Sequence, residues 1–194
     1  MAKVIIHATI TLDGFMADPD GRVDWMFGFP TDDRDQGVVE KVMAQLGAVV
    51  GGANREQTVE DDGQPYGGML KIPVFLMTHS AHEPVEKNGV TYTFVVDDIG
   101  HAVALAKSAA GDKAVALLGG SISRQCLKLG LVDEIHLDVV PLLLGDGISL
   151  FAGLGERIRL ERIHTSAFAS EAHLIYRVDK SSASSPMPAS KAPT

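Results

Sequence analysis

Residues 114–129, AVALLGGSISRQCLKL, are the most informative stretch of the sequence. The first five residues predict a short buried strand, and the segment after the two glycines predicts a helix with Ser121 as its N-cap that continues to Leu129. Where a strand leads through glycines into a helix, the free N–H groups and the helix dipole attract an anion, and glycine lets that anion approach the backbone. The junction therefore predicts either a phosphate or pyrophosphate site or a close-packed turn without a ligand.

Two details narrow the interpretation of this junction. No Lys follows the glycines and the pattern G-x-G-x-x-G does not occur there, so the junction is neither a P-loop nor a dinucleotide fingerprint. Cys126 shares its expected helix face with Ile122 and Leu129, which indicates a core residue rather than a nucleophile.

A second glycine turn, GGAN at residues 51–54, follows the short apolar run at 48–50 and has Asn54 as a candidate helix cap. The carboxyl ends of parallel strands meet at one edge of a sheet, where open α/β sheets bind their ligands. Two such turns on one edge favour an extended ligand with several phosphates. Residues 145–147, GDG, follow an alternating segment and open no helix, so they are expected to form a plain turn.

Short apolar segments alternate with helical ones over the first two thirds of the chain. Strands are predicted at residues 4–10, 48–50, 74–77, 91–96 and 114–118, and helices at 37–46 and 99–109. In the last third, residues 135–139, 158–161 and 173–178 alternate along the chain, with His173 among the residues between the apolar ones, which predicts half-exposed antiparallel strands at the end of the sheet. The expected fold is α/β, with a mixed, mostly parallel sheet and helices on both of its faces.

Length and charge set broad limits on the function. The chain has 194 residues, a mass of 20.6 kDa, a formal net charge of -8 and a pI near 5.3. Roughly 70% of the unfolded surface can be buried in a core of this size, so residues 1–180 are expected to form one domain. Residues 181–194, SSASSPMPASKAPT, lack a core-forming pattern and are expected to be a disordered tail. An acidic chain without a Lys/Arg cluster is not expected to bind nucleic acid.

Cysteine usage and the N-terminal segment indicate a cytoplasmic protein. Cys126 is the single cysteine, so neither an intramolecular disulfide nor a cysteine zinc site can form. The first residues do not resemble a secretory signal, and no run of 18 apolar residues predicts a membrane span. His79 and His82 lack an accompanying ligand pattern, so no bound metal is expected.

Several segments together resemble a known family. They are LDG at residues 12–14, Trp25, the turn at 51–54, VFLMTH at 74–79, LGG at 118–120, GLVDE at 130–134 and VPLLLGDG at 140–147. Over about residues 3–178 the chain resembles the dihydrofolate reductase-like family, and more narrowly its branch related to the C-terminal reductase domain of the bifunctional riboflavin-biosynthesis deaminase/reductase. The resemblance implies a three-layer dihydrofolate reductase-like fold and NADPH as the cofactor.

The resemblance also implies which residues contact the cofactor. Those expected over the nicotinamide are Ala8, Leu12, Asp13, Gly14 and Phe15. Those expected at the adenosine phosphate are Gly51, Gly52, Ala53, Asn54, Thr78 and His79. Those expected around the pyrophosphate are Leu118, Gly119, Gly120, Ser121, Ile122 and Ser123. In the family this turn commonly contains a cis peptide, which the two glycines would tolerate.

One departure from the family pattern concerns the 2′-phosphate of NADPH. Gly52 and Asn54 stand where the family usually has Arg and Thr. Because an Arg fork is well suited to recognise a phosphate, Arg55 or Arg124 would have to take this role.

The candidate acids lie before the first expected helix. In folate reductases, a carboxylate near this helix start orients the pterin and assists its protonation, and the resemblance makes Asp33 and Asp35 the candidates here. Together with Asp32 they also form the usual favourable placement of acids at a helix N-terminus, which is the structural alternative. Trp25 is likewise either a wall of the substrate pocket or a partly buried packing residue.

These observations predict an NADPH-dependent reductase that transfers a hydride to a small heteroaromatic substrate of the pterin, folate or aminouracil type. Deaminase activity is not expected, because the His/Cys zinc pattern is absent from the sequence. The alternative is a non-catalytic nucleotide-binding or sensor protein that keeps the cofactor cleft. The resemblance and the alternating strands at 134–140 and 158–178 also predict a homodimer.

Overall fold

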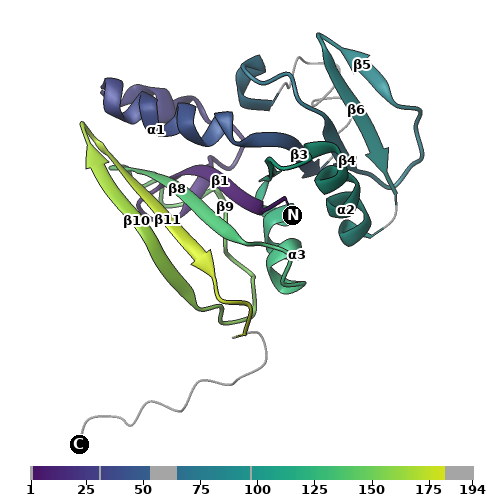
Figure 1. The fold of residues 1–194 in the computed structure, drawn as a ribbon. Helices are drawn as coiled ribbons and strands as arrows, with labels where there is room; N and C mark the ends of the chain where they lie inside the picture. The colour runs from purple at the N-terminus through teal and green to yellow at the C-terminus, as the bar shows by residue number, and fades with distance from the viewer. Residues whose placement is uncertain (1, 31, 53–64, 97, 182–194) are drawn as a thin grey trace, which may run out of the picture.

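Figure 1 shows the computed structural model of the chain, which describes residues 2–30, 32–52, 65–96 and 98–181. Of the expected tail, only Ser181 is among them. The strands are β1 (Val4–Thr11), β2 (Phe15–Ala17), β3 (Leu46–Gly52), β4 (Val74–Met77), β5 (Val85–Lys87), β6 (Val90–Val95), β7 (Ala114–Leu118), β8 (Glu134–Val140), β9 (Ile148–Ser149), β10 (Leu160–Phe168) and β11 (Glu171–Val178). The helices are α1 (Asp33–Ala44), α2 (Ile99–Ala110) and α3 (Gly120–Lys128), with short 3-10 helices η1 (Asp24–Gly28) and η3 (Pro65–Gly68).

The main sheet has nine strands in the order β10-β11-β8-β1-β7-β3-β4-β6-β5. Every pairing from β8 to β6 is parallel. Strands β10 and β11 add an antiparallel edge on one side, and β5 adds one on the other. A mixed, mostly parallel sheet with antiparallel C-terminal strands is thus confirmed.

The helices cover both faces of this sheet, which makes three layers (Figure 1). Val42 of α1 packs with Ile5 and Leu76 in one apolar core on the first face. Val103 of α2 and Cys126 of α3 belong to the core on the opposite face. Cys126 is fully buried, as expected, and burial raises the pKa of its thiol to about 12. Among the described residues, no helix is long and apolar enough to cross a membrane.

The alternation in the last third of the chain led to one wrong expectation. Strand β8 is not a half-exposed antiparallel strand, because it runs parallel to β1 and is antiparallel only to β11. Its polar residues His136 and Asp138 are each only 5% exposed. The alternation arises because one face of β8 is covered by the apolar core and the other by buried polar side chains. Strand β10 also begins at Leu160 rather than at residue 158.

Helix α1 begins at Asp33 rather than at residue 37, because the aspartates before it form a capping box. The Asp32 carboxylate accepts hydrogen bonds from the backbone N–H groups of Arg34, at 2.8 Å, and Asp35, at 3.3 Å. The Asp35 carboxylate in turn accepts one from the N–H of Asp32 at 2.9 Å. The structural interpretation of this acidic cluster is therefore correct, although Asp35 has a second role described below.

Helix α3 corrects two expectations. Its N-cap is Gly119, with a φ of 92°, and not Ser121. This positive φ, which glycine adopts without strain, already turns the chain from β7 into the helix. The peptide bonds of the described residues are all trans, so the cis peptide expected between Gly119 and Gly120 is wrong.

Candidate active site

The two glycine turns lie side by side at the carboxyl edge of the sheet, as the sequence predicts. Strands β3 and β7 are neighbours, and their register pairs Gly51 with Leu118. Both turns line a cavity of about 370 Å³, which we call the glycine groove. Its lining comprises Gly51, Gly52, Leu118, Gly119, Gly120, Ser121 and Ile122, together with Val49, Pro65, Val74 and Leu76.

The start of α3 offers this groove an anion site. Gly119 precedes the helix and no side chain caps it, so the N–H groups of the first turn have no side-chain partner. At Gly120 an added Cβ would lie 2.9 Å from the carbonyl oxygen of Ser149, which requires a glycine. The hydroxyl of Ser123, in a residue that is 1% exposed, has no hydrogen-bond partner among the described residues. A helix start with free N–H groups suits a diphosphate.

Four other predicted cofactor contacts follow β3 and β4. Ala53 and Asn54 lie outside the described residues. Thr78 and His79 come directly after β4, the strand beside β3, so they stand at the same edge. The backbone N–H of Thr78 donates a hydrogen bond to Val95 at 3.0 Å, and the His79 side chain is exposed. Their contact with the adenosine phosphate stays a prediction.

Asp13 ties the loop after β1 to a distant turn. Its carboxylate accepts a hydrogen bond from the Thr11 hydroxyl at 2.5 Å and others from the N–H groups of Gly145, at 2.8 Å, and Leu144, at 3.3 Å. The Thr11 hydrogen bond, with those from the turn, holds the pKa of Asp13 below its ordinary value. The turn at 145–147 therefore positions this loop, and no helix opens after it.

The remaining residues assigned to the nicotinamide do not line the glycine groove. Ala8 packs against the core on the α2 and α3 side of the sheet. Leu12 is 69% exposed and lines a different cavity with Phe168. Gly14 has a φ of 87°, and Phe15 begins β2. Their nicotinamide contacts also stay a prediction.

A second cavity, of about 440 Å³, is lined by residues of α1 and η1 and of strands β1, β8 and β11, and we call it the α1 pocket. Its apolar lining residues are Met26, Phe27, Phe29, Val39, Met43 and Met69. Its polar lining residues are Thr9, Asp35, Gln36, Glu40, Asp138 and Glu171. The pocket thus combines apolar and aromatic walls with four carboxyl groups, a lining suited to a ring with polar edges.

The structure separates the predicted catalytic residues. Asp35 lines the α1 pocket, whereas Asp33 is exposed on the first turn of α1 and does not. Trp25 is not among the lining residues, although the next two residues of η1, Met26 and Phe27, are. The indole N–H of Trp25 is buried and has no hydrogen-bond partner among the described residues.

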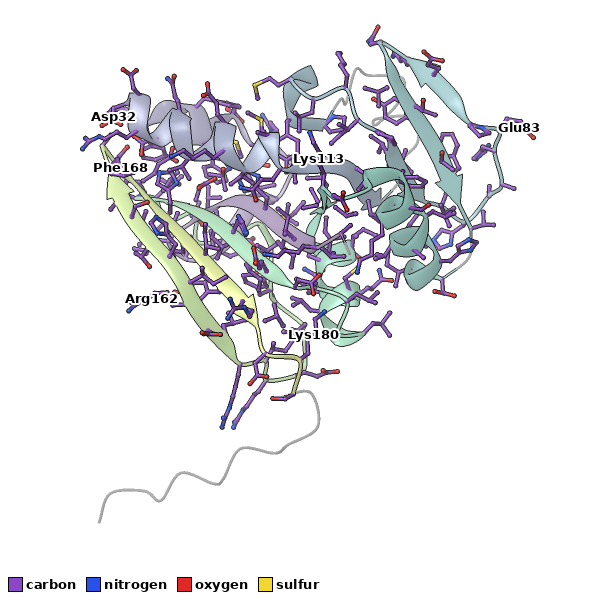
Figure 2. The ribbon with its side chains drawn as sticks, in the orientation of Figure 1. Asp32, Glu83, Lys113, Arg162, Phe168 and Lys180 are labelled. Atoms are coloured by element: carbon purple, nitrogen blue, oxygen red, sulfur yellow. The ribbon has the colours of Figure 1, made fainter. Side chains whose placement is uncertain are left out.

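Contacts with the β10–β11 hairpin fix the start of α1. Figure 2 shows Asp32, at this helix start, close to Phe168 at the tip of the hairpin. The Arg34 guanidinium lies over the Phe168 ring, 4.8 Å from its centroid, and pairs with Asp32 at 2.6 Å. The Ser170 hydroxyl donates a hydrogen bond to the carbonyl oxygen of Pro30 at 2.7 Å. These contacts fix the position of the first turn of α1, and with it Asp35, relative to the sheet.

A chain of buried hydrogen bonds, which we call the polar chain, runs from Asp35 across the sheet. His173 Nε2 lies 3.0 Å from Asp35 Oδ1, and His173 Nδ1 lies 2.6 Å from Asp138 Oδ1. Asp138 Oδ2 lies 3.2 Å from His7 Nε2, and His7 Nδ1 lies 3.1 Å from the hydroxyl of Tyr66. Three strands contribute to it, because His7, Asp138 and His173 lie on the neighbouring strands β1, β8 and β11.

The pKa values indicate which groups of the polar chain donate hydrogen bonds and which accept them. The hydrogen bond to Asp138, opposed by burial and aided by Asp35, raises the pKa of His173 to about 9, so its ring is a cation that donates to both carboxylates. Burial opposes ionisation of Asp138, but hydrogen bonds from His173 and His7 outweigh it and lower the pKa to about 2. Burial, with the charge of Asp138, raises the pKa of Tyr66, so the phenol keeps its proton and donates to His7. Every proton in the chain then points toward a carboxylate or toward His7.

Tyr66 holds its end of the polar chain in an uncommon backbone conformation. Its φ of 55° lies in the left-handed region that side chains other than glycine rarely adopt. The ring stacks on that of His7, with centroids 5.6 Å apart and an interplanar angle of 20°. Strain of this kind persists only where surrounding contacts hold it, and it concentrates at functional sites.

Reasoning from sequence missed His7, Tyr66, Asp138, Glu171 and His173. Asp138 and His173 were interpreted as outward-facing residues of alternating strands, whereas they face each other across β8 and β11. An available signal was that the acidic and histidine residues of each segment lie on one face of the strand: Glu134, His136 and Asp138 in the first, and Glu171 and His173 in the second. Arg124 is also placed differently from the expectation: its guanidinium donates to the carbonyl oxygens of Ser149 and Leu150 at 2.9 and 3.2 Å.

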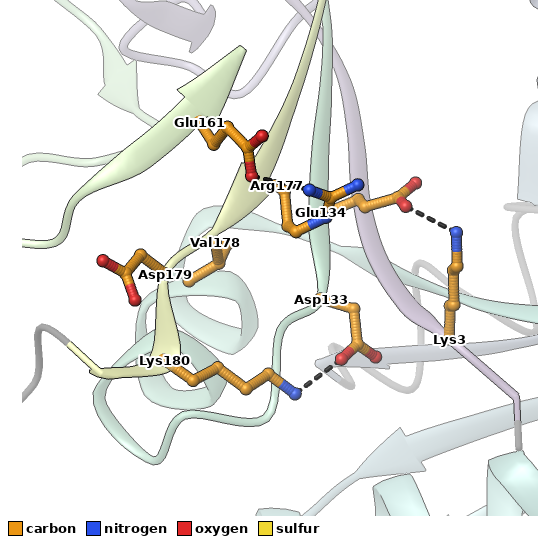
Figure 3. Close-up of a pocket in the computed structure, with 8 residues that line it drawn as sticks. All are labelled: Lys3, Asp133, Glu134, Glu161, Arg177, Val178, Asp179 and Lys180. Atoms are coloured by element: carbon orange, nitrogen blue, oxygen red, sulfur yellow. Dashed lines mark hydrogen bonds and ion pairs between the residues drawn. The ribbon is translucent and has the colours of Figure 1, made fainter. Parts of the chain in front are cut away.

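A third cavity, of about 570 Å³, lies at the opposite end of the strands, where β8 begins and β11 ends (Figure 3). Each of its cations is paired with a carboxylate. The pairs are Lys3 with Glu134 at 2.6 Å, Arg177 with Glu161 at 2.6 Å and Lys180 with Asp133 at 2.5 Å. The three cations of this cavity are thus partly neutralised by the carboxylates beside them.

Comparisons with known proteins agree with this geometry. A model of the RibD C-terminal domain matches residues 2–174. The uncharacterized protein YyaP of Bacillus subtilis is 28% identical over an alignment of 181 residues that covers 87% of this chain and 90% of that protein. A crystal structure from Shewanella sp. PV-4, provisionally assigned to riboflavin biosynthesis, is 26% identical with a TM-score of 0.75 and covers 92% of this chain and 99% of its own.

Two more distant structures share the fold. One is a diaminohydroxyphosphoribosylaminopyrimidine deaminase/5-amino-6-(5-phosphoribosylamino)uracil reductase of Thermotoga maritima, with 17% identity and a TM-score of 0.63 over 92% of this chain and 57% of that one. The other is dihydrofolate reductase of Enterococcus faecalis complexed with NADP(H), with 11% identity and a TM-score of 0.58 over 91% and 96% of the two chains. At these identities the similarity shows the dihydrofolate reductase-like fold alone.

Proposed function

Because the chain belongs to the RibD C-terminal domain family, we propose that it is an NADPH-dependent reductase of a small heteroaromatic substrate of the pterin, folate or aminouracil type. The observation that carries the proposal is the placement of two different cavities over neighbouring strands. The glycine groove lies at β3 and β7, and the α1 pocket lies at β1 and β8. The segment at η3 contributes to both, since Pro65 lines the groove and Met69 lines the pocket.

The glycine groove fits the dinucleotide. The N–H groups at the start of α3 can hold the diphosphate, and Gly119 and Gly120 keep the backbone free of side chains where the phosphates would approach. When bound, the nicotinamide supplies the hydride. The protein then has to bind the substrate ring, exclude water around it and provide a proton.

In the α1 pocket, Asp35 is the residue that we assign to orienting the substrate and the water that passes a proton to it. Its carboxylate lies at the pocket lining and is fixed from behind by His173 at 3.0 Å and by the N–H of Asp32 at 2.9 Å. A carboxylate held on two sides has a fixed position, so it can accept hydrogen bonds from the substrate ring and orient a bound water that passes a proton to that ring. The polar chain behind it keeps that direction constant.

The experiment that tests the proposal measures cofactor binding and turnover separately. NADPH and NADH are added at millimolar concentration while the melting temperature is recorded, and reduced-nicotinamide absorbance is then followed with folates, pterins and aminouracils. A cofactor-dependent rise in melting temperature followed by substrate-dependent oxidation supports the reductase. Binding without oxidation across the panel favours the non-catalytic nucleotide-binding protein instead, and no shift with either cofactor overturns the proposal.

We also propose that the protein is a homodimer that uses the edge of the sheet at β10. Strand β10 is nine residues long, pairs only with β11 among the described strands, and is exposed at most of its positions. A long exposed edge strand is a ready site for pairing with another chain. Light scattering at micromolar concentration should give about twice the chain mass of 20.6 kDa, and a mass near that of one chain would refute the dimer.

A further inference from the structure

The described lining of the α1 pocket is acidic, and the cation behind it, His173, is already paired with Asp35 and Asp138. The charged lining residues are Asp35, Glu40, Asp138 and Glu171, and none of the described lining residues is Lys, Arg or His. His173, which lies behind the lining, already donates both ring N–H groups to carboxylates. The nearby Arg34 is paired with Asp32 and lines a different cavity.

This lining opposes a phosphorylated ligand. A phosphate in the pocket would lie within several ångströms of carboxylates, where each like-charge pair costs about 1–4 kcal/mol at effective dielectric constants of about 80 to 20. Burying the phosphate without a paired cation adds a desolvation cost. The Thermotoga maritima protein, by contrast, is described as a reductase of a phosphoribosylamino compound.

Glu171 is a buried acid of the pocket that accepts no hydrogen bond from a described residue. Asp35 and Asp138 each have both carboxylate oxygens hydrogen-bonded within the polar chain or the capping box. Glu171 is only 9% exposed, and no described residue donates a hydrogen bond to its carboxylate. Burial, with the charge of Asp138, raises the pKa of Glu171. A buried acceptor in this state is stabilised by a ligand that brings an N–H donor or a positive charge.

The shape of the pocket specifies the rest of the ligand. The side chains of Met26, Phe29, Val39, Met43 and Met69 line it, and these thioether, aromatic and aliphatic groups pack well on a flat ring. Phe27, which is 80% exposed, also contributes to the lining. A volume of about 440 Å³ lies within the range of about 300–1,000 Å³ that is usual for small-molecule sites.

We propose that the α1 pocket takes a phosphate-free heteroaromatic substrate whose amino or ring N–H donors bind Glu171, and that it rejects the phosphorylated form of the same compound. This inference rests on the proposed function and narrows its substrate class. It makes Glu171 a specificity-determining residue of the pocket.

A divalent cation is the competing occupant, because Asp138, Glu171 and His173 offer ligand atoms within 4.8 Å of one another. The structure favours the organic donor. Both ring nitrogens of His173 are already donors to carboxylates, so binding a metal would require the ring to lose a proton and break one of these hydrogen bonds.

The test uses 5-amino-6-ribitylaminouracil and its 5′-phosphate, two compounds that differ in the phosphate alone. Their dissociation constants are measured by calorimetry on the full chain with NADPH present, after NADPH binding itself has been measured. The phosphate-free compound should bind at least about tenfold more tightly. Equal affinity, or tighter binding of the phosphate ester, overturns the inference while NADPH binding still supports the proposed function.

Three variants assign the preference to this pocket, and a Mn²⁺ measurement tests the competing occupant. Glu171→Gln should weaken the phosphate-free compound by about tenfold, as expected for loss of one charge-assisted hydrogen bond. Glu83→Gln, an exposed change at the far end of the molecule (Figure 2), should not affect it. Gln36→Lys, at an exposed lining position of α1, should raise the affinity for the phosphate ester by about tenfold and keeps the inference testable if Glu171→Gln does not fold. Micromolar binding of Mn²⁺ that Glu171→Gln abolishes would overturn the inference in favour of a metal site.

Discussion

The face of the sheet under α1 has two halves that are buried to a similar extent but built from opposite chemistry. The apolar half includes Ile5, Val49, Val74, Leu76 and Ala116, each at most 2% exposed. The polar half is the polar chain, in which His7, Asp138 and His173 are 9, 5 and 1% exposed. Strand β1 belongs to both halves, since Ile5 points into one and His7 into the other.

The apolar half and the polar half line different cavities. Val49, Val74 and Leu76 of the apolar half line the glycine groove, whereas Asp35 and Asp138 of the polar half line the α1 pocket. Buried charges are often no more stabilising than hydrocarbon of the same volume, so stability alone does not explain the polar half. We infer a division of labour, in which the apolar half supports the cofactor and the polar half orients the substrate and handles its proton.

The largest expected effect comes from removing the cation of the polar half. His173→Leu leaves the carboxylates of Asp35 and Asp138 buried and unpaired, so it should lower the free energy of unfolding by about 3–5 kcal/mol in urea denaturation. Adding Asp138→Asn should restore part of this loss, because one of the two negative charges is then removed.

The matched change in the apolar half is Leu76→Ala, which should cost about 2–5 kcal/mol by leaving a cavity. Asp138→Asn should give no recovery in that background, because Leu76 touches no charge of the polar chain. A cost below about 1 kcal/mol for His173→Leu would show that the polar half is not a charge-paired unit.

The next largest expected effect is on turnover, which should depend on the polar half. Asp35→Asn removes the negative charge that orients the substrate and its proton source in the α1 pocket, so kcat/KM should fall by about a hundredfold, which corresponds to about 2.7 kcal/mol. Asp112→Asn, at an exposed turn after α2, is the matched control and should leave kcat/KM unchanged. An unchanged rate in Asp35→Asn would show that another residue orients the substrate and its proton source.

The polar half should also make stability depend on pH. The pKa of His173 is raised from its ordinary value of 6.5 to about 9, so its stabilisation is complete below pH 6.5 and is lost as the pH rises through about 9. The loss between pH 6.5 and 9.5 should be of the order of 1–3 kcal/mol in urea denaturation. Leu76→Ala should keep this slope and His173→Leu should lose it, and the same slope in all three proteins would assign it to another group.

The sequence predicts one half of this face much better than the other. Local apolar runs predict strands, helices and both glycine turns, because a run of apolar side chains next to a glycine turn specifies the structure within a few residues. The register that brings Gly51 beside Leu118 then follows from parallel pairing of adjacent strands.

The polar half depends on contacts that no local pattern contains. His7 meets Asp138 across 131 residues of sequence, and His173 meets Asp35 across 138. An alternating strand looks the same in sequence whether its polar side faces water or a buried network. Asp33 and Asp35 were equal candidates for the same reason, and only the capping box, which turns Asp35 inward at the third position of α1, separates them.

The most direct test of the division of labour is the affinity for NADPH of two variants, one beside each half. Gly119→Ala places a side chain at a φ of 92° at the start of α3, and Asp35→Asn changes the α1 pocket. We predict that NADPH binds about tenfold more weakly to Gly119→Ala, provided that its melting temperature shows a folded protein, and equally well to Asp35→Asn. Weaker NADPH binding by Asp35→Asn together with unchanged binding by Gly119→Ala would contradict the account.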